Sequence, residues 1–260
     1  MAHIDNTVLG SFCWVELSTT DQNAAKTFYS SLFAWTTTDQ PMGPGQFYTM
    51  FFLDGREVAA AYTMTKEEAG MPPHWNLYIA VESADAAAAR VTELGGKVLA
   101  GPFDVFEAGR LAVIQDPTGA IFHVWQANKH AGIRISNVSG AFCWADLNTS
   151  NAAAASAFYS GLFGWKIEKG EHDHSGYLHL KNGDTFIGGI PSPEQIPPNT
   201  PPHWMLYFQV DDCDASLAKA TGLGAHTLMP AMTLEGVGRF AVIADAQGAA
   251  FSLFTPAPRG

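Results

Sequence analysis

Three side chains in the first half of the chain have the types that a metal site or an acid and base pair needs. Glu16 lies in one apolar segment, His74 begins another after a Pro-Pro pair, and His123 lies in a third. Two imidazoles and one carboxylate suit iron(II) or zinc, and the same groups serve as general acid and base. These three residues are therefore the catalytic candidates, with or without a divalent metal.

Aromatic side chains accompany these candidates in both halves of the chain. If the segments are strands, alternate residues share a face, which leaves Cys13, Val15 and Leu17 under a helix. The opposite face is rich in rings, which either stack on a planar ligand or fill the protein core. The residues expected on that inward face are Phe12, Trp14, Asn76 and Tyr78 in the first half, with Phe142, Trp144, Asp146, His203 and Tyr207 in the second.

The polar members of this set have structural roles open to them as well. His74 and His203 each follow two prolines, which have no backbone N–H to donate. The imidazole can therefore hydrogen-bond to the backbone there, as an alternative to contacting a ligand. One further difference separates the halves, because Ser252 stands where the first half has His123. The first site is therefore expected to be the more polar one.

The carboxylates Glu16 and Asp146 stand at matching places in the two halves. An inward carboxylate is costly to bury without a partner. Arg110 and Arg239, each following a glycine at the start of a strand, are the candidate partners and are also counted as ligand-binding residues. A structural ion pair and a general base or substrate anchor are both compatible with the pattern.

Two other groups of residues resemble reactive sites. The cluster 171–174, Glu-His-Asp-His, has metal-binding side chains, but the glycines and serine around it favour a solvated loop. Cys13 and Cys143 each precede a tryptophan on the predicted helix side, which favours buried, unreactive thiols.

Composition excludes several classes of function. The 260 residues include 14 Lys and Arg against 25 Asp and Glu, and the formal net charge of −11 would repel nucleic acid and anionic membranes. Three cysteines form no disulfide framework, and the N-terminus lacks the pattern of a signal peptide. No apolar run reaches the roughly 18 residues of a membrane span. We therefore expect a soluble, cytoplasmic protein that binds a small molecule.

The chain is a tandem duplication. Phe12-Cys13-Trp14 recurs as Phe142-Cys143-Trp144, and the Pro-Pro-His-Trp segment, Gly109-Arg110 and Phe28-Tyr29 each recur at the matching position of the second half. This spacing is far longer than that of a solenoid repeat, so each copy is predicted to be a domain. The predicted domains are residues 1–130 and 131–260, with a linker at 128–138.

Within each copy the order of elements also repeats. N-cap residues precede two amphipathic helices, and glycines follow the second helix. The simplest description is an α+β fold of four βαβββ units, two in each domain. In the first domain we expect strands at 12–17, 47–53, 57–64, 75–81, 97–99, 110–115 and 120–126, and helices at about 22–33 and 84–94.

Together, the unit order, the helix that ends in Phe-Tyr followed by Leu-Phe-x-Trp, the Leu-Gly-Gly segment and the Asp-Pro-x-Gly turn resemble the vicinal oxygen chelate superfamily. This superfamily includes glyoxalase I, bleomycin resistance proteins and extradiol dioxygenases. The tandem length and the Pro-Pro-His-Trp signature are most similar to two-domain actinobacterial glyoxalase-like proteins of the CFP30B type, some of them labelled hydroxylases. The resemblance implies that the units of a domain pair into a half-open mixed-sheet barrel around one cavity.

The resemblance also implies where metal ligands would lie. In metal-dependent members the first and last strands of each unit supply them, and the corresponding positions here are Trp14, Asn76, the segment 58–62 and His123. Only His123 is of a ligand type. We therefore expect no metal cofactor, and keep a divalent Fe, Zn, Ni or Mn ion in the first domain as the alternative.

The resulting functional prediction is a metal-free member of this superfamily that binds a planar aromatic or secondary-metabolite ligand. Binding is expected to serve sequestration or modest acid and base catalysis by Glu16 with His74 or His123. The alternative is a metal-dependent glyoxalase-like lyase or a hydroxylase or dioxygenase. Because related single-domain proteins dimerise, the two copies are expected to form a pseudo-dimer within one monomeric chain.

Overall fold

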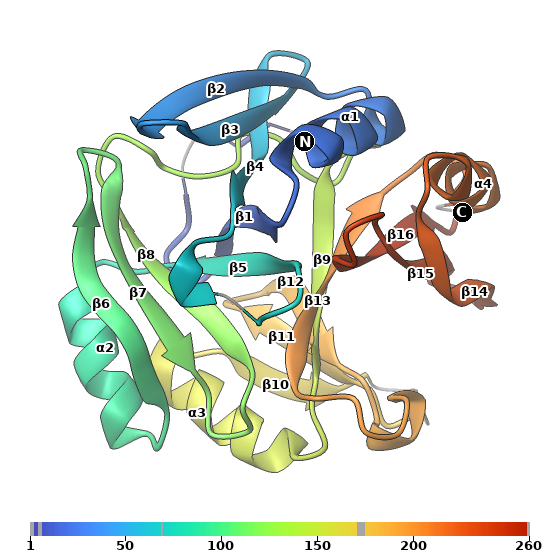
Figure 1. The fold of residues 1–260 in the computed structure, drawn as a ribbon. Helices are drawn as coiled ribbons and strands as arrows, with labels where there is room; N and C mark the ends of the chain where they lie inside the picture. Colours follow the sequence, from blue (N-terminus) through green and yellow to red (C-terminus); the bar gives the residue numbers. More distant parts are fainter. Residues whose placement is uncertain (1–2, 5–6, 69, 171–174, 259–260) are drawn as a thin grey trace.

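Two curved mixed β-sheets form the molecule, one from each half of the chain (Figure 1). This computed structural model describes residues 3–4, 7–68, 70–170 and 175–258. The strand order is β2-β3-β4-β1-β5-β8-β7-β6 in the first sheet and β10-β11-β12-β9-β13-β16-β15-β14 in the second. Each sheet joins two βαβββ units through their first strands, which run antiparallel. The predicted α+β class and unit order are confirmed.

The elements of the first domain lie close to their predicted positions. Two features were not predicted: a strand directly after the first helix, and the full length of β6. The elements are β1 (Phe12–Thr19), α1 (Gln22–Phe33), β2 (Thr36–Gly43), β3 (Gln46–Leu53), β4 (Arg56–Thr63), β5 (His74–Ala80), α2 (Ala84–Glu93), β6 (Lys97–Val105), β7 (Gly109–Gln115) and β8 (Ile121–Ala127), with a short 3-10 helix at Lys66–Glu68.

The second domain repeats this order with a shorter first hairpin. Its β10 and β11 are only four and five residues long, against eight each for β2 and β3. The elements are β9 (Phe142–Asn148), α3 (Ala152–Phe163), β10 (Lys166–Lys169), β11 (Leu178–Asn182), β12 (Thr185–Ile190), β13 (His203–Gln209), α4 (Cys213–Gly222), β14 (His226–Leu234), β15 (Gly238–Ala244) and β16 (Ala250–Pro256), with a 3-10 helix at Pro193–Gln195.

Helix starts follow the predicted capping chemistry. The side chain of Asp21 accepts a hydrogen bond from the backbone N–H of Ala24 at the start of α1, and Ser83 does the same for Ala86 at the start of α2. After α2, Gly95 adopts a φ of +83°, the left-handed conformation that favours glycine. Local sequence therefore sets the ends of these helices.

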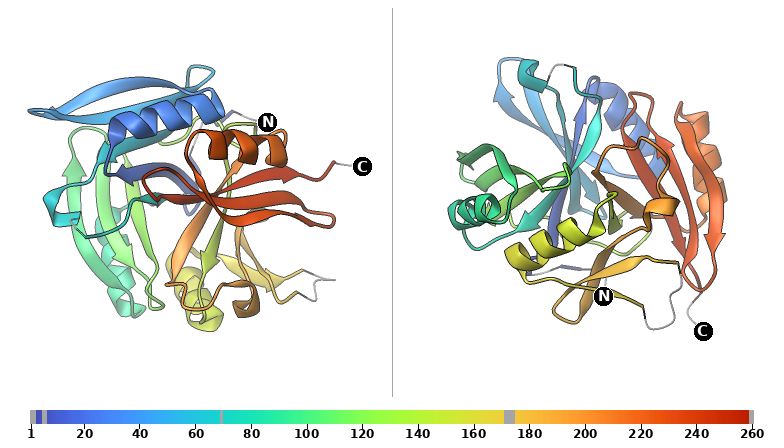
Figure 2. Two further views of the ribbon diagram at one scale, coloured as in Figure 1. Left: turned by 45° about the vertical axis from the view of Figure 1, so that its right-hand side comes forward. Right: turned by 90° about the horizontal axis from the view of Figure 1, so that it is seen from below.

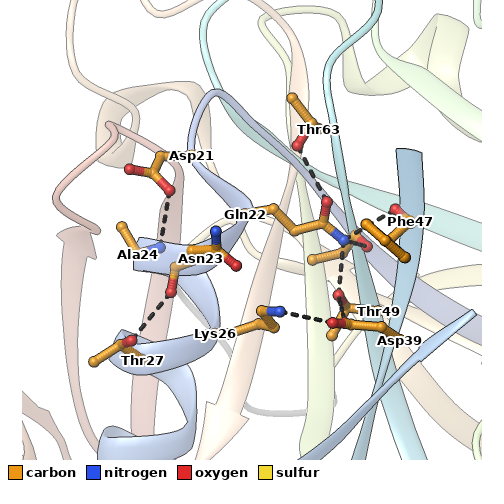
Figure 3. Close-up of polar contacts among 11 residues, drawn as sticks. Asp21, Gln22, Asn23, Ala24, Lys26, Thr27, Asp39, Phe47, Thr49 and Thr63 are labelled. Atoms are coloured by element: carbon orange, nitrogen blue, oxygen red, sulfur yellow. Dashed lines mark hydrogen bonds and ion pairs between the residues drawn. The ribbon is translucent and has the colours of Figure 1, made fainter. Parts of the chain in front are cut away.

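A polar network fixes α1 to the first hairpin of domain 1 (Figure 3). The side-chain amide of Gln22 donates hydrogen bonds to the carbonyls of Phe47 and Ala61 and to the hydroxyl of Thr49. One turn further along α1, Lys26 forms an ion pair of 2.8 Å with Asp39 on β2. In α3 the position of Gln22 is taken by Ala152, so the shorter hairpin of domain 2 lacks this anchor.

Helices α1 and α3 lie between the two sheets, each packed against the other domain (Figure 2). Tyr29 of α1 packs on Phe251 of β16 with ring centroids 5.6 Å apart. In the reciprocal contact, Tyr159 of α3 packs on Phe122 of β8 at 5.4 Å. Buried aromatic rings therefore form a core shared by both domains.

Reciprocal hydrogen bonds complete this interface. The Tyr29 hydroxyl donates to Asp245 at 2.9 Å, and the Tyr159 hydroxyl donates to Asp116 at 3.0 Å. Each of these aspartates also accepts backbone N–H bonds within its own turn. Such matched contacts are those of a two-fold interface, so the two domains pair within the chain as predicted.

In the part of the chain that the structure describes, no helix is both long and apolar enough to span a lipid bilayer.

Candidate functional site

The face of each sheet opposite its helices, called the inner face below, carries most of the predicted site residues. In domain 1 the antiparallel pairing of β1 and β5 places Trp14 opposite Tyr78 and Glu16 opposite Asn76. The parallel pairing of β5 and β8 places His123 beside Tyr78. The structure therefore brings these five predicted residues together.

Glu16 is the centre of this inner face. Its carboxyl group accepts hydrogen bonds from the hydroxyls of Tyr48 at 2.6 Å and Tyr78 at 2.8 Å. The indole N–H of Trp14 donates to the Tyr48 hydroxyl at 3.0 Å. Burial raises the pKa of the Glu16 carboxyl, and the two tyrosine hydrogen bonds offset part of that rise. The group is therefore easier to protonate than an exposed glutamate.

A second polar chain runs beside Glu16 toward the edge of the sheet. Asn76 donates to the Ser18 hydroxyl at 2.8 Å, and Ser18 donates to the Tyr62 hydroxyl at 2.7 Å. Tyr62 in turn donates to the carboxylate of Glu68 at 2.5 Å. The inner face of domain 1 thus carries two neighbouring groups of hydrogen-bonded side chains.

His123 lies beside these groups, with its imidazole ring buried. Its ring stacks on Tyr78 with centroids 4.5 Å apart, and its Nδ1 is buried with no hydrogen-bond partner among the described residues. Burial and the nearby His74 lower the pKa of His123 to about 3, although a backbone hydrogen bond at Leu77 acts in the opposite direction. The ring is therefore neutral at physiological pH and presents a lone pair or an N–H to the site.

His74 and His203 are held by the backbone, as one of their two interpretations predicts. Nδ1 of His74 lies 2.9 Å from the carbonyl of Pro72, and Nδ1 of His203 lies 2.9 Å from the carbonyl of Pro201. Both imidazoles are half-buried, and Nε2 of His203 also lies 3.2 Å from Nδ2 of Asn148.

Domain 2 repeats the carboxyl centre with Asp146. Tyr177 and Tyr207 donate hydrogen bonds of 2.6 and 2.8 Å to its two oxygens, and the Trp144 indole donates at 3.0 Å. Burial raises the pKa of this carboxyl as well, against the lowering effect of these donors. Met205 lies opposite Asp146, where Asn76 lies opposite Glu16. The predicted difference in polarity is therefore present.

The predicted inward direction of Phe12 is wrong because of a β-bulge. The register between β1 and β5 shifts after Phe12, so that Phe12 pairs with Ile79 while Trp14 pairs with Tyr78. Residues that pair directly share a face, and one extra residue in a strand reverses that face. Phe12 instead packs against Trp165 and Trp204 of the other domain, with centroids 5.6 and 5.4 Å away.

Phe142 departs from its predicted direction for the same reason. The register of β9 and β13 shifts between Tyr207 and Phe208, so Phe142 pairs with Phe208 on the helix side. It lies 6.1 Å from Phe12 across the domain interface. Both phenylalanines therefore hold the domains together.

The predicted pairing of Arg110 and Arg239 with the inner carboxylates is also wrong. Arg110 forms a two-bond contact with Asp85 on α2, at 2.7 and 2.9 Å. Arg239 does the same with Asp214 on α4, at 2.6 and 2.8 Å. Tyrosine hydroxyls contact the inner carboxylates in place of the expected cations. The alternation of residues along the strands does not predict these pairs.

The thiols agree with their predicted inertness. Burial raises the pKa of both Cys13 and Cys143, which keeps these thiols protonated. Cys143 is half-buried and donates to the carbonyl of Tyr207. The predicted loop cluster at 171–174 lies outside the described residues.

The residues at the expected metal positions do not fit a metal ion. Trp14 and Asn76 are occupied by hydrogen bonds to Tyr48 and Ser18, and Ala60 lies next to Glu16 on β4. Across 3–4, 7–68, 70–170 and 175–258, no group of three or more His, Cys, Asp and Glu side chains is arranged to hold one. The orphaned Nδ1 of His123 is the sole ligand-type feature at those positions.

Sequence reasoning missed three tyrosines of the two inner faces. Tyr48 and Tyr62 come from β3 and β4, and Tyr177 directly precedes β11. Tyr48 alternates with Met50 and Phe52 in an apolar segment. This pattern predicts a strand, but it does not show which face of the strand points inward.

Comparison with known proteins agrees with this architecture. A family model described as the Glyoxalase/Bleomycin resistance protein/Dioxygenase superfamily matches residues 11–124, and one described as a Glyoxalase-like domain matches residues 144–254. The chain is similar to a Mycobacterium bovis protein described as "Putative glyoxylase CFP32", with 44% identity and coverage of 95% of both chains. It is also similar to the anthracycline biosynthesis protein DnrV of Streptomyces peucetius, with 34% identity over 94% of this chain and 92% of DnrV.

Solved structures show the same fold at low identity. The Mn(II)-bound glyoxalase from Novosphingobium aromaticivorans aligns with a TM-score of 0.65 and 16% identity, covering 98% of this chain and 83% of the other. The 2,3-dioxygenase LapB from Pseudomonas sp. KL28 aligns with a TM-score of 0.65 and 11% identity, covering 98% and 94%.

Proposed function

Since the chain belongs to the glyoxalase/bleomycin resistance protein/dioxygenase superfamily, we propose that it binds a planar aromatic molecule, such as a secondary metabolite, on its inner faces. The observation that carries this proposal is the buried carboxyl group, ringed by two tyrosines and a tryptophan, that occurs in both domains. Rings offer stacking surfaces, and the hydroxyls and carboxyl fix the orientation of a ligand.

The curated relatives support this ligand class. DnrV and DauV are both described as anthracycline biosynthesis proteins, and each is 34% identical to this chain. Anthracyclines contain planar fused rings with polar substituents, which match a surface of indole and phenol groups. The ligand of this chain is therefore proposed to be a fused-ring compound.

Glu16 is the proposed acid and base group of domain 1. Its raised pKa brings it closer to neutrality than an exposed glutamate, which favours proton exchange with a ligand. His123, neutral and unpartnered at Nδ1, is placed to exchange a hydrogen bond with the same ligand. His74 lies at the neighbouring register position, opposite Ser18.

Tryptophan fluorescence tests the proposal. We expect 1,8-dihydroxyanthraquinone to quench the protein, and Trp144→Phe to remove more of the quenching than Trp14→Phe, because Trp144 is half-buried and Trp14 is 3% exposed. Adamantanol, apolar but not planar, is the matched control ligand. Equal effects of the two compounds, or no binding up to about 1 mM, would contradict the proposal.

A second candidate is a metal-dependent glyoxalase-like lyase or a hydroxylase or dioxygenase. It is favoured by the description of the mycobacterial relative and by the unpartnered Nδ1 of His123. Elemental analysis of protein purified without chelator tests this candidate. Stoichiometric Fe, Zn, Ni or Mn that is lost in His123→Ala would support it over the metal-free binder.

A further inference from the structure

The interdomain linker occupies a groove between β1 and β4 of domain 1. The backbone N–H of Ile133 donates to the carbonyl of Cys13, and that of Arg134 donates to the carbonyl of Glu57, each at 2.8 Å. These two bonds join the linker to one strand on either side, so a short extended segment fills the gap where the strands begin.

Close approach in this groove depends on a glycine. Gly132 has a φ of +106°, and a Cβ added to it would lie 2.0 Å from the Cys13 carbonyl oxygen. His130 precedes it and packs edge-on against Trp14, with ring centroids 4.4 Å apart. The linker therefore contributes an imidazole edge, a glycine and an aliphatic side chain in a fixed order.

The duplication creates an equivalent groove in domain 2, between β9 and β12. Asp146 aligns with Gly189 there as Glu16 aligns with Ala60 in domain 1. Counting back along the strands, Cys143 corresponds to Cys13 and Phe186 to Glu57. The acceptors equivalent to those of the linker are therefore the carbonyls of Cys143 and Phe186.

In domain 2 this groove is a pocket of about 280 Å³. Cys13 and Trp14 are 2% and 3% exposed under the linker, whereas Cys143 and Trp144 are half-buried. The pocket is mostly apolar and aromatic, and its walls include Phe12, Phe142, Cys143, Trp144, Phe186 and Ile187. No described segment makes the two linker-type backbone bonds in it.

We propose that this pocket is a docking site for an extended peptide segment of a partner protein, with an imidazole or aromatic ring, a glycine two residues later and an aliphatic residue directly after the glycine. The linker shows that the same groove geometry accepts such a segment through backbone hydrogen bonds, the mode by which strands recognise peptides.

One position of the partner differs from the linker. Arg134 lies 4.0 Å from the carboxylate of Glu57, but Phe186 replaces that acid in domain 2. A cation would have no counter-charge there, and an apolar side chain would pack on the Phe186 ring instead. The probe that follows from the structure is the capped pentapeptide His-Ala-Gly-Ile-Leu.

Calorimetric titration of the whole protein with this peptide tests the proposal. We expect saturable binding with a Kd at or below about 1 mM, and at least about tenfold weaker binding of the His-Ala-Ala-Ile-Leu peptide, whose extra Cβ collides with the groove. Phe186 is 51% exposed, so Phe186→Asp leaves the fold intact and is expected to weaken binding to a similar degree.

Leu228→Asp is the matched control variant, since Leu228 is 59% exposed on β14 of the same domain and outside the pocket. It is expected to bind the peptide like the unmodified protein. Equal binding of the two peptides, no binding, or equal losses in both variants would overturn the proposal.

Discussion

The inner faces of the two domains keep the same centre and differ in what surrounds it. Glu16 and Asp146 each accept hydrogen bonds from two tyrosine hydroxyls next to a tryptophan. Around this centre, Trp14 and Tyr78 are buried in domain 1, whereas Trp144 and Tyr207 are half-buried in domain 2. The carboxyl centre is therefore the duplicated unit, and the exposure of the rings around it is what has diverged.

The polar neighbours have diverged in the same direction. Domain 1 has His123 and Asn76 on its inner face, and domain 2 has Ser252 and Met205 at the matching places. At a third position Tyr62 is replaced by Pro191. Domain 1 thus combines many polar contacts with buried rings, and domain 2 combines fewer polar contacts with half-buried rings. Two ligand specificities are expected from one chain.

The largest expected effect separates the two tryptophans. Trp14→Ala removes a buried ring and is expected to lower the free energy of unfolding by about 3–5 kcal/mol. Trp144→Ala is expected to cost less, because half-burial leaves part of the ring in water already. Urea denaturation of the two variants measures the difference, and equal losses would show that the two faces are equally closed.

Tyr62→Phe sharpens the comparison at a position unique to domain 1. Removing this hydroxyl breaks its hydrogen bonds with Ser18 and Glu68, at an expected cost of about 1 kcal/mol in the free energy of unfolding. Ligand quenching of Trp144 in domain 2 is expected to stay unchanged. A change in that quenching would mean that the two inner faces are coupled.

The smallest expected effect is a pH dependence shared by both carboxyls. Burial raises the pKa of Glu16 in the folded state, so its contribution to stability is complete at pH values below the ordinary glutamate range. It is lost as the pH rises through the folded-state pKa. Two tyrosine hydrogen bonds to the charged form reduce this loss, which keeps the effect small.

Paired neutral variants measure it. Relative to Glu16→Gln, the unmodified protein is expected to lose stability between acid and neutral pH, and Asp146→Asn is expected to show the same sign. Denaturation curves at several pH values provide the test. A gain in relative stability over that range would mean that the tyrosines outweigh burial.

Much of this arrangement follows from local patterns in the sequence. The repeat of Phe-Cys-Trp and Pro-Pro-His-Trp predicts two domains of the same build, and alternation along β1 and β5 places Trp14, Glu16 and Tyr78 on one face. These features depend on residues close together in the chain, where the strand period of two and helix capping determine the outcome.

What the sequence does not predict depends on a register shift or on distant partners. A single bulge after Phe12 turns that ring toward the other domain, and no residue type in this segment predicts the bulge. Tyr48 joins Glu16 from 32 residues away, and Arg110 joins Asp85 on a neighbouring helix instead of an inner carboxylate. Three-dimensional pairing decides these contacts.

The crossed bonds from Tyr29 to Asp245 and from Tyr159 to Asp116 have a consequence for how the duplicated gene can evolve. Cutting the chain at the linker would leave one tyrosine hydroxyl and one aspartate without their partners in each fragment. It would also expose the apolar rings packed around them. Neither fragment is expected to stay folded without the other. The interface therefore makes each copy depend on the other for stability, while the residues of the two inner faces stay free to differ.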